Sequence, residues 1–145
     1  MAAQRTAEVT WDGDLLTGKG RIRFGSRAIS ETPVTWASRT ESPDGKTSPE
    51  ELLAGAHASC FSMALSAELA RNRTPPKKLE TKATATFDRV GDGWRVTTME
   101  LSVRGEVPGI DGSKFAEIAE DAKNNCPISQ ALKNNVDVTL KASLT

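Results

Sequence analysis

Two cysteines are the residues of this chain best suited to chemistry. Cys60 lies within an apolar stretch that has no charged residue between Glu51 and Glu68, and Cys126 directly precedes Pro127, where a helix must break. A thiol inside a helix and a second thiol at a chain break are the parts of a dithiol redox site. In a chain without a secretion signal, such a pair more often serves redox or metal chemistry than a structural disulfide.

Cys60 needs a cation to be reactive. The thiolate is the nucleophile, an ordinary thiol has a pKa of about 8.5, and apolar burial raises that pKa. Because Cys60 stands in the middle of its expected helix, the helix dipole does not help it. An arginine from another element, held by a carboxylate, would supply the cation that Cys60 needs, although composition does not say which arginine this is. On these residues alone, a Cys60 that is merely buried is an equally good interpretation.

The other polar candidates near the cysteines have simpler interpretations. His57 stands one turn before Cys60 and could act as a base, but we expect a packed, hydrogen-bonded core or interface histidine. A zinc site is not expected, because no fourth soft ligand and no ligand-spacing motif accompanies these residues. Gly18 and Gly20 flank a lysine without the further glycines and the Lys-Ser/Thr ending of a phosphate loop. We therefore expect neither a metal nor a cofactor.

Composition and charge limit the function classes. The 145 residues carry 19 basic and 19 acidic side chains, so the net charge of zero gives no electrostatic footprint for nucleic acid or an anionic membrane. The N-terminal residues lack the apolar run of a secretion signal, and the uncharged stretch 52–67 is too short to span a bilayer. We expect one soluble domain over residues 1–145 in the cytoplasm, where any disulfide between the cysteines would be transient.

Several strands are expected around the cysteine segments. Alternating stretches at 6–11, 20–25 and 34–39 predict strands in the first third of the chain. Residues 79–90 alternate throughout, and a Gly-Asp-Gly turn leads into a second strand at 94–103. The apolar phase slips inside that second strand, so we expect a β-bulge near 97–98. A last half-buried strand is expected at 136–140.

A long helix carries Cys60. Ser48 is a typical N-cap, Pro49 fits the first helical position and Glu51 completes a Ser-x-x-Glu capping box, so the helix should begin there and end near Arg71. Small and apolar residues cover every face of this helix, which in a soluble protein indicates burial on every face. Either two copies of the chain share the helix in one core, or the second helix and the sheet enclose it within one chain. We favour the homodimer.

Two shorter helices follow. The second helix has one apolar face, made of Phe115, Ile118, Ala119 and Ala122, and a short third helix is expected at 127–133. Hairpin strands with segregated helices predict the fold class α+β, with a mainly antiparallel sheet packed against the long central buried helix.

Two segments resemble the signature segments of a known family. Residues 47–65 around Cys60 and residues 125–132 around Cys126 are similar to those of the OsmC/Ohr family of thiol peroxidases. Supporting matches are Trp-Asp-Gly-Asp at 11–14, Gly-Lys-Gly at 18–20, Ser-Arg-Thr at 38–40 and Val-Pro-Gly-Ile-Asp at 107–111. The resemblance covers essentially the whole chain. The run His-Ala-Ser-Cys-Phe-Ser-Met resembles the osmotically inducible (OsmC) branch.

This resemblance implies an intertwined homodimer and a cofactor-free peroxidase that reduces organic hydroperoxides, and hydrogen peroxide less efficiently. By motif position, Cys60 resembles the peroxidatic cysteine and Cys126 the resolving one. Arg39 resembles the active-site arginine of the OsmC branch, and Glu50 the carboxylate that orients it. The family also implies that an external dithiol, such as a lipoyl-bearing protein, reduces the resulting disulfide. The alternative is a thiol redox sensor or small-molecule-binding protein that uses the same disulfide without turnover.

The spacing of Glu50 and Cys60 restricts how the site can form. Ten residues of one continuous helix cover about 15 Å along the axis, more than a glutamate side chain can bridge. Either the helix breaks near Gly55, where glycine costs about 1 kcal/mol relative to alanine, or Glu50 and Arg39 serve the Cys60 of the other subunit. The capping box at Ser48 favours the second alternative, a site shared at the dimer interface.

Overall fold

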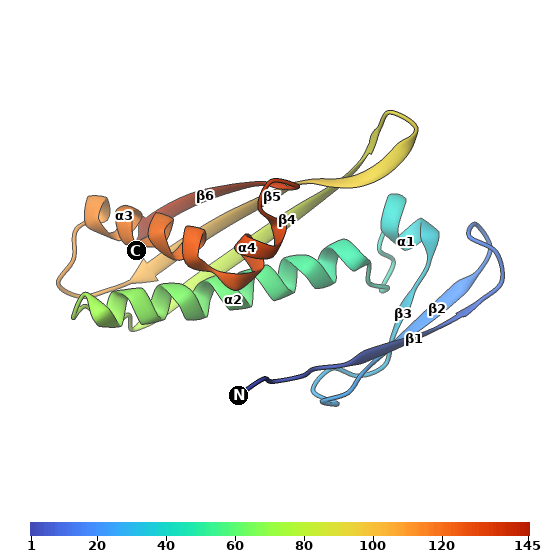
Figure 1. Cartoon of the computed structure of the whole chain (residues 1–145), viewed down its shortest axis with the longest axis horizontal. Helices are drawn as coiled ribbons and strands as arrows, with labels where there is room; N and C mark the ends of the chain where they lie inside the picture. Colours follow the sequence, from blue (N-terminus) through green and yellow to red (C-terminus); the bar gives the residue numbers. More distant parts are fainter. The chain divides into compact units, whose positions relative to one another are not determined.

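The computed structural model describes all 145 residues, and the chain divides into two compact units, Met1–Leu52 and Leu53–Thr145 (Figure 1). The first unit contains β1 (Ala7–Asp12), β2 (Lys19–Phe24), β3 (Thr32–Val34) and α1 (Trp36–Thr40). The second contains β4 (Lys78–Val90), β5 (Gly93–Glu106), α3 (Gly112–Asn125), α4 (Pro127–Leu132) and β6 (Asp137–Leu144). Helix α2 (Pro49–Arg71) runs across the division. The predicted α+β class is confirmed, and the single domain stays a prediction.

The first unit is built on an antiparallel sheet with the strand order β1-β2-β3. Ile22 and Val34 are its buried apolar residues. Trp11 pairs with Gly20 across β1 and β2, and a Cβ atom at Gly20 would lie 2.9 Å from the Trp11 ring. Glycine at this position therefore lets the indole lie against the strand. The strands predicted at 6–11 and 20–25 are confirmed.

The strand predicted at 34–39 is wrong beyond Val34, because the chain turns into α1. Thr35 is the N-cap: its hydroxyl accepts a hydrogen bond from the Ser38 amide at 3.0 Å, and the Ser38 hydroxyl accepts one from the Thr35 amide at 2.9 Å. This reciprocal capping box satisfies donors at the helix start. It makes five residues helical although their apolar pattern also fits a strand.

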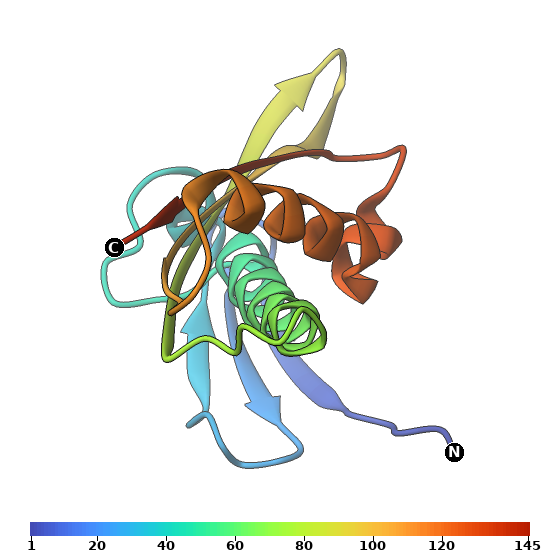
Figure 2. The same ribbon diagram turned by 90° about the vertical axis from the view of Figure 1, so that its left-hand side faces the viewer.

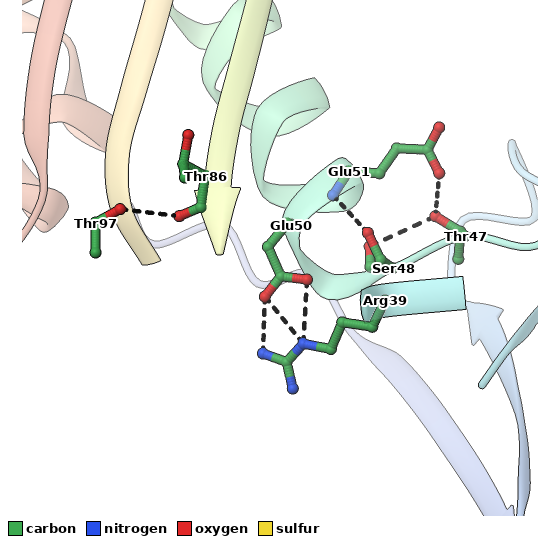
Figure 3. Close-up of polar contacts among 7 residues, drawn as sticks. All are labelled: Arg39, Thr47, Ser48, Glu50, Glu51, Thr86 and Thr97. Atoms are coloured by element: carbon green, nitrogen blue, oxygen red, sulfur yellow. Dashed lines mark hydrogen bonds and ion pairs between the residues drawn. The ribbon is translucent and has the colours of Figure 1, made fainter. Parts of the chain in front are cut away.

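Helix α2 begins and ends where the sequence predicts. The Ser48 hydroxyl accepts a hydrogen bond from the Glu51 amide at 3.1 Å, which confirms the cap. The predicted reciprocal bond is absent, because the Glu51 carboxylate instead accepts one from the Thr47 hydroxyl at 2.7 Å (Figure 3). The helix is continuous over its 23 residues, so the alternative of a break near Gly55 is wrong.

A single chain buries only one stripe of α2. The wholly buried residues stand four apart, on one face of the helix: His57, Phe61, Leu65 and Leu69. On the other side Met63 is 68% exposed, and Gly55, Ala56 and Ala67 are exposed as well. The predicted burial on every face is therefore wrong for one chain, and so is the alternative that one chain encloses the helix.

The length of α2 also corrects an expectation from the sequence. At 23 residues, α2 is long and apolar enough to cross a membrane by length and composition alone, although the uncharged stretch within it looked too short. Helices that pack in a protein core pass the same test, and Phe61, Leu65 and Leu69 of α2 pack in such a core.

The second unit is built on a three-stranded sheet in the order β4-β5-β6. Strands β4 and β5 form a long antiparallel hairpin in which Thr86 pairs with Thr98 and Phe87 pairs with Val96. Thr97 is left as the extra residue of a β-bulge, and its hydroxyl donates to the Thr86 carbonyl oxygen at 3.5 Å (Figure 3). The bulge predicted from the slip in apolar phase is confirmed.

Strand β6 lies parallel to β5. The sheets remain mainly antiparallel, since the other three strand pairs are antiparallel. Parallel neighbours need a crossover connection, and the segment containing α3 and α4 supplies it. Cys126 sits in this crossover, between the two helices.

The main core lies between this sheet and two helices, α2 and α3, which lie on the same side of it (Figures 1 and 2). Strand β5 contributes its buried residues Leu101 and Val103. A Cβ atom at Gly105 of the same strand would come within 2.7 Å of the Phe115 ring, so glycine leaves the room that this ring fills. The apolar face predicted for α3 is confirmed, because its buried residues are Phe115, Ile118, Ala119 and Ala122.

Candidate functional site

Cys126 is held at the junction of two helices. A residue before proline is driven out of helical geometry, and Cys126 has φ −61° and ψ 126°, which is extended. Its amide still donates to the Ala122 carbonyl oxygen at 2.9 Å, and its own carbonyl oxygen accepts from the Gln130 amide at 2.9 Å. Cys126 thus ends α3 and begins α4, with a fully buried free thiol.

Cys60 meets this junction from α2. Its thiol is free and half-buried, and it packs against the main core. Cys126, which belongs to this core, and the backbone amide of Ile128 in the first turn of α4 lie close enough to the Cys60 thiol to influence its pKa. Neighbouring thiols can form a disulfide where the chain brings their Cα atoms within about 7 Å of each other.

The surroundings of Cys60 in its own unit do not activate it. Burial raises the pKa of the Cys60 thiol above its ordinary value, the Ile128 amide opposes that rise, and the neighbouring Cys126 adds to it. None of these groups is a cation. A thiolate at neutral pH therefore requires a positive charge from elsewhere, as the sequence led us to expect.

Arg39 and Glu50 form the second pair of predicted site residues, within the first unit. The arginine Nε donates to both carboxylate oxygens at 3.0 and 3.1 Å, and Nη2 donates to Oε1 at 2.7 Å (Figure 3). The Glu50 side chain is only 8% exposed, and the Trp36 ring lies 5.9 Å from the guanidinium carbon. A fork of this kind fixes the plane of the guanidinium group. Glu50 therefore fixes the orientation of the Arg39 side chain, and the role of the pair in an active site stays a prediction.

His57 has the role that the sequence predicted. It is fully buried, and its Nε2 is hydrogen-bonded to the Ser129 hydroxyl of α4 at 2.8 Å. Burial lowers the pKa of the His57 ring, so the ring is neutral at pH 7. His57 is a packed core histidine.

The structure brings the predicted residues together as two pairs, Cys60 with Cys126 and Arg39 with Glu50. Their catalytic roles stay predictions. Sequence reasoning missed Ser129, which contacts the histidine next to the cysteine pair. A signal was present: Ser129 lies three residues after Cys126, and His57 lies three residues before Cys60.

Comparison with known proteins gives a consistent result. A family model described as OsmC-like protein matches residues 42–141. The peroxiredoxin OsmC of Escherichia coli (strain K12) is 38% identical over 144 residues, which cover 99% of each chain. The organic hydroperoxide resistance protein OhrA of Bacillus subtilis (strain 168) is 33% identical over 130 residues, 86% of this chain and 88% of the relative.

Solved structures share the fold. The organic hydroperoxide resistance protein OhrB of Bacillus subtilis has a TM-score of 0.76 with this chain, at 24% identity, and the match covers 95% of this chain and 98% of that one. At this level of identity the likeness concerns the fold alone.

Proposed function

Because this chain belongs to the OsmC family, we propose that it is a cofactor-free cysteine peroxidase that reduces organic hydroperoxides to alcohols, and hydrogen peroxide less efficiently. The observation that carries the proposal is that the Cys60 and Cys126 thiols are neighbours within one chain. The names of the relatives, a peroxiredoxin and an organic hydroperoxide resistance protein, support this class of substrate.

The reaction uses the two thiols in turn. The Cys60 thiolate attacks the distal oxygen of the hydroperoxide, the O–O bond breaks, and the alkoxide takes a proton and leaves as the alcohol. Cys60 is then a sulfenic acid. The Cys126 sulfur attacks the Cys60 sulfur, a water molecule leaves, and the disulfide forms. An external dithiol reduces this bond by thiol–disulfide exchange and returns both thiols.

Arg39 supplies the charge that Cys60 lacks. Burial raises the pKa of the Cys60 thiol, so the thiolate must be stabilised by a cation. The Arg39 guanidinium is held by three hydrogen bonds to Glu50 and is therefore preorganised. It stabilises the thiolate first and the departing oxygen later.

Two copies of the chain complete the site. Helix α2 is continuous, and ten residues of it separate Glu50 from Cys60 by about 15 Å along the axis. We therefore place the Arg39–Glu50 pair of one subunit at the Cys60 of the other, in a homodimer that acts in the cytoplasm. The exposed side of α2, with Met63 and several small residues, supports a close approach of a second copy.

Steady-state turnover tests this proposal. The protein is mixed with cumene hydroperoxide and dihydrolipoamide, peroxide loss is followed, and the state of both cysteines is read by mass spectrometry. Sustained consumption is expected for the wild type, none for Cys60→Ser, and one oxidation followed by overoxidation of Cys60 for Cys126→Ser. A single stoichiometric burst in the wild type would indicate a redox sensor, and equal residual activity in both variants would contradict the assigned roles.

A further inference from the structure

A buried hydrogen bond links the two cysteine-bearing segments. His57 Nε2 and the Ser129 hydroxyl lie 2.8 Å apart, although 72 positions separate them in the chain. The histidine is fully buried and the serine is nearly so. The bond joins α2 to α4, the two elements that present Cys60 and Cys126 to one another.

His57 and Ser129 each lie three residues from one of the two cysteines. His57 lies three residues before Cys60, so the two side chains share one face of α2. Ser129 lies three residues after Cys126, within α4. Cys126 and the Ile128 amide are also neighbours of the Cys60 sulfur, the atom that is oxidised, and the Ile128 side chain packs against the main core. The His57–Ser129 hydrogen bond does not involve that atom, so oxidation leaves both of its partners chemically unchanged.

Besides this hydrogen bond, α4 is held by the packing of Ile128 against the main core and by a hydrogen bond that the Gln130 side chain donates to the Asn124 carbonyl oxygen. It has only 6 residues, it starts at a proline after an extended residue, and no side chain caps its N-terminus. The Nδ1 atom of His57 is buried without a hydrogen-bond partner. Loss of the Ser129 hydroxyl would leave both ring nitrogens of His57 buried and unpaired, an arrangement that favours a local shift of α4 or entry of water.

We propose that His57 and Ser129 are positioning residues for the second chemical step: their hydrogen bond keeps Cys126 within reach of Cys60 after Cys60 has been oxidised. The inference rests on the proposed peroxidase function. In the step concerned, the Cys126 sulfur bonds to the sulfur of the Cys60 sulfenic acid and water leaves. If Cys126 is displaced, a second hydroperoxide has time to convert the sulfenic acid to sulfinic acid, with release of a second alcohol.

The first chemical step does not depend on this bond. His57 is neutral, because burial lowers the pKa of its ring, and its Nε2 is engaged by Ser129 rather than by a thiol. It therefore acts neither as the cation nor as the base for Cys60. Variants that break the bond should separate the two steps, which a general loss of folding would not do.

The experiment measures both rate constants in one single-turnover reaction. Protein is mixed with cumene hydroperoxide and quenched with a thiol-alkylating reagent, and the thiol, disulfide and sulfinic forms are counted by mass spectrometry. Ser129→Ala should slow disulfide formation about tenfold, which corresponds to about 1.4 kcal/mol and so to one hydrogen bond. Oxidation of Cys60 should stay within about twofold of wild type, and the sulfinic fraction per turnover should rise.

Matched variants test whether the hydrogen bond itself is responsible. His57→Gln places a polar atom near the position of Nε2 and should retain most of the disulfide rate, whereas His57→Asn is too short and should behave like Ser129→Ala. Ser129→Thr keeps the hydroxyl and should also retain the rate. The double variant His57→Asn with Ser129→Ala should be no slower than either single variant, because both remove the same bond.

Three results would overturn the inference. They are an unchanged disulfide rate in Ser129→Ala and His57→Asn, an equal slowing of both chemical steps, and failure of the conservative variants to retain the rate. The proposed function fails separately, if wild-type protein forms no Cys60–Cys126 disulfide with the hydroperoxide.

Discussion

Subunit mixing tests whether the active site is shared. Cys60→Ser removes the nucleophile, and Glu50→Ala removes all three hydrogen bonds that orient Arg39. Loss of a positioned charge at an active site costs on the order of 10²–10³ in rate, so each variant alone should be nearly inactive. In a heterodimer with shared sites, however, one site combines the intact Cys60 of one subunit with the intact Glu50 of the other.

The expected activity follows from the symmetry of the dimer. Random pairing of equal amounts makes about half of the dimers mixed, and each mixed dimer has one wild-type site of two, so the mixture should reach about one quarter of wild-type activity. The two variants are co-expressed with different affinity tags, the doubly tagged dimers are isolated, and hydroperoxide consumption is measured. Isolated heterodimers should then show about half of the wild-type rate.

A matched control comes from the cysteine pair. Cys60 and Cys126 are neighbours within one chain, so heterodimers of Cys60→Ser with Cys126→Ala should not regain turnover. If the Cys60→Ser and Glu50→Ala subunits form heterodimers that stay inactive, the shared site is wrong. Because α2 has no break, the Arg39–Glu50 pair would then be a structural ion pair.

Three further predictions concern single residues. Arg39→Ala should raise the pH midpoint for alkylation of Cys60 by iodoacetamide, because the cation that offsets the rise in pKa caused by burial would be lost. An unchanged midpoint would mean that another cation activates the site. Gly105→Ala should lower the free energy of unfolding in urea by about 1–3 kcal/mol, since its Cβ would come within 2.7 Å of a buried aromatic ring. The control is Gly112→Ala, which should change the free energy of unfolding little because no atom lies within 4 Å of the added Cβ. Burial lowers the pKa of His57, so the unfolded chain binds a proton at this ring at a higher pH than the folded chain does. The free energy of unfolding should therefore fall as the pH drops below the ordinary value of 6.5, by up to about 1.4 kcal/mol per pH unit, and His57→Gln should lack this component.

The sequence predicts the elements of the second unit well, because their periodicity is strong. The alternating face of β4, the bulge at Thr97 and the apolar face of α3 all come from spacing alone. The parallel direction of β6 cannot be predicted from spacing, since alternation shows which face of a strand is buried and not which strand it pairs with. Trp36 to Thr40 was misjudged because a five-residue helix is too short to show its period. Its signal was the Thr35-x-x-Ser38 cap.

Prediction of the site depended on two kinds of information. The chain break before Pro127 and the apolar run around Cys60 singled out the thiols, and the structure places them near each other. Arg39 and Glu50 were found by resemblance alone, because nothing local relates an arginine in one element to a carboxylate eleven residues away. The prediction that α2 is buried on every face was wrong for one chain. An apolar helix indicates that other groups pack against it, but it does not say whether those groups belong to the same chain.

The late position of Cys126 in the chain has a consequence during synthesis. Cys126 follows Cys60 by 66 residues, and β6, which completes the sheet behind both, follows later still. At about 5–20 residues per second, a ribosome needs about 3–13 s to reach the second cysteine after the first. Throughout that interval the nascent chain carries the Cys60 thiol without the Cys126 thiol that could form a disulfide with it. The proposed site also needs the Arg39–Glu50 pair of a second subunit, so it can be complete only after the whole chain has been made and has paired.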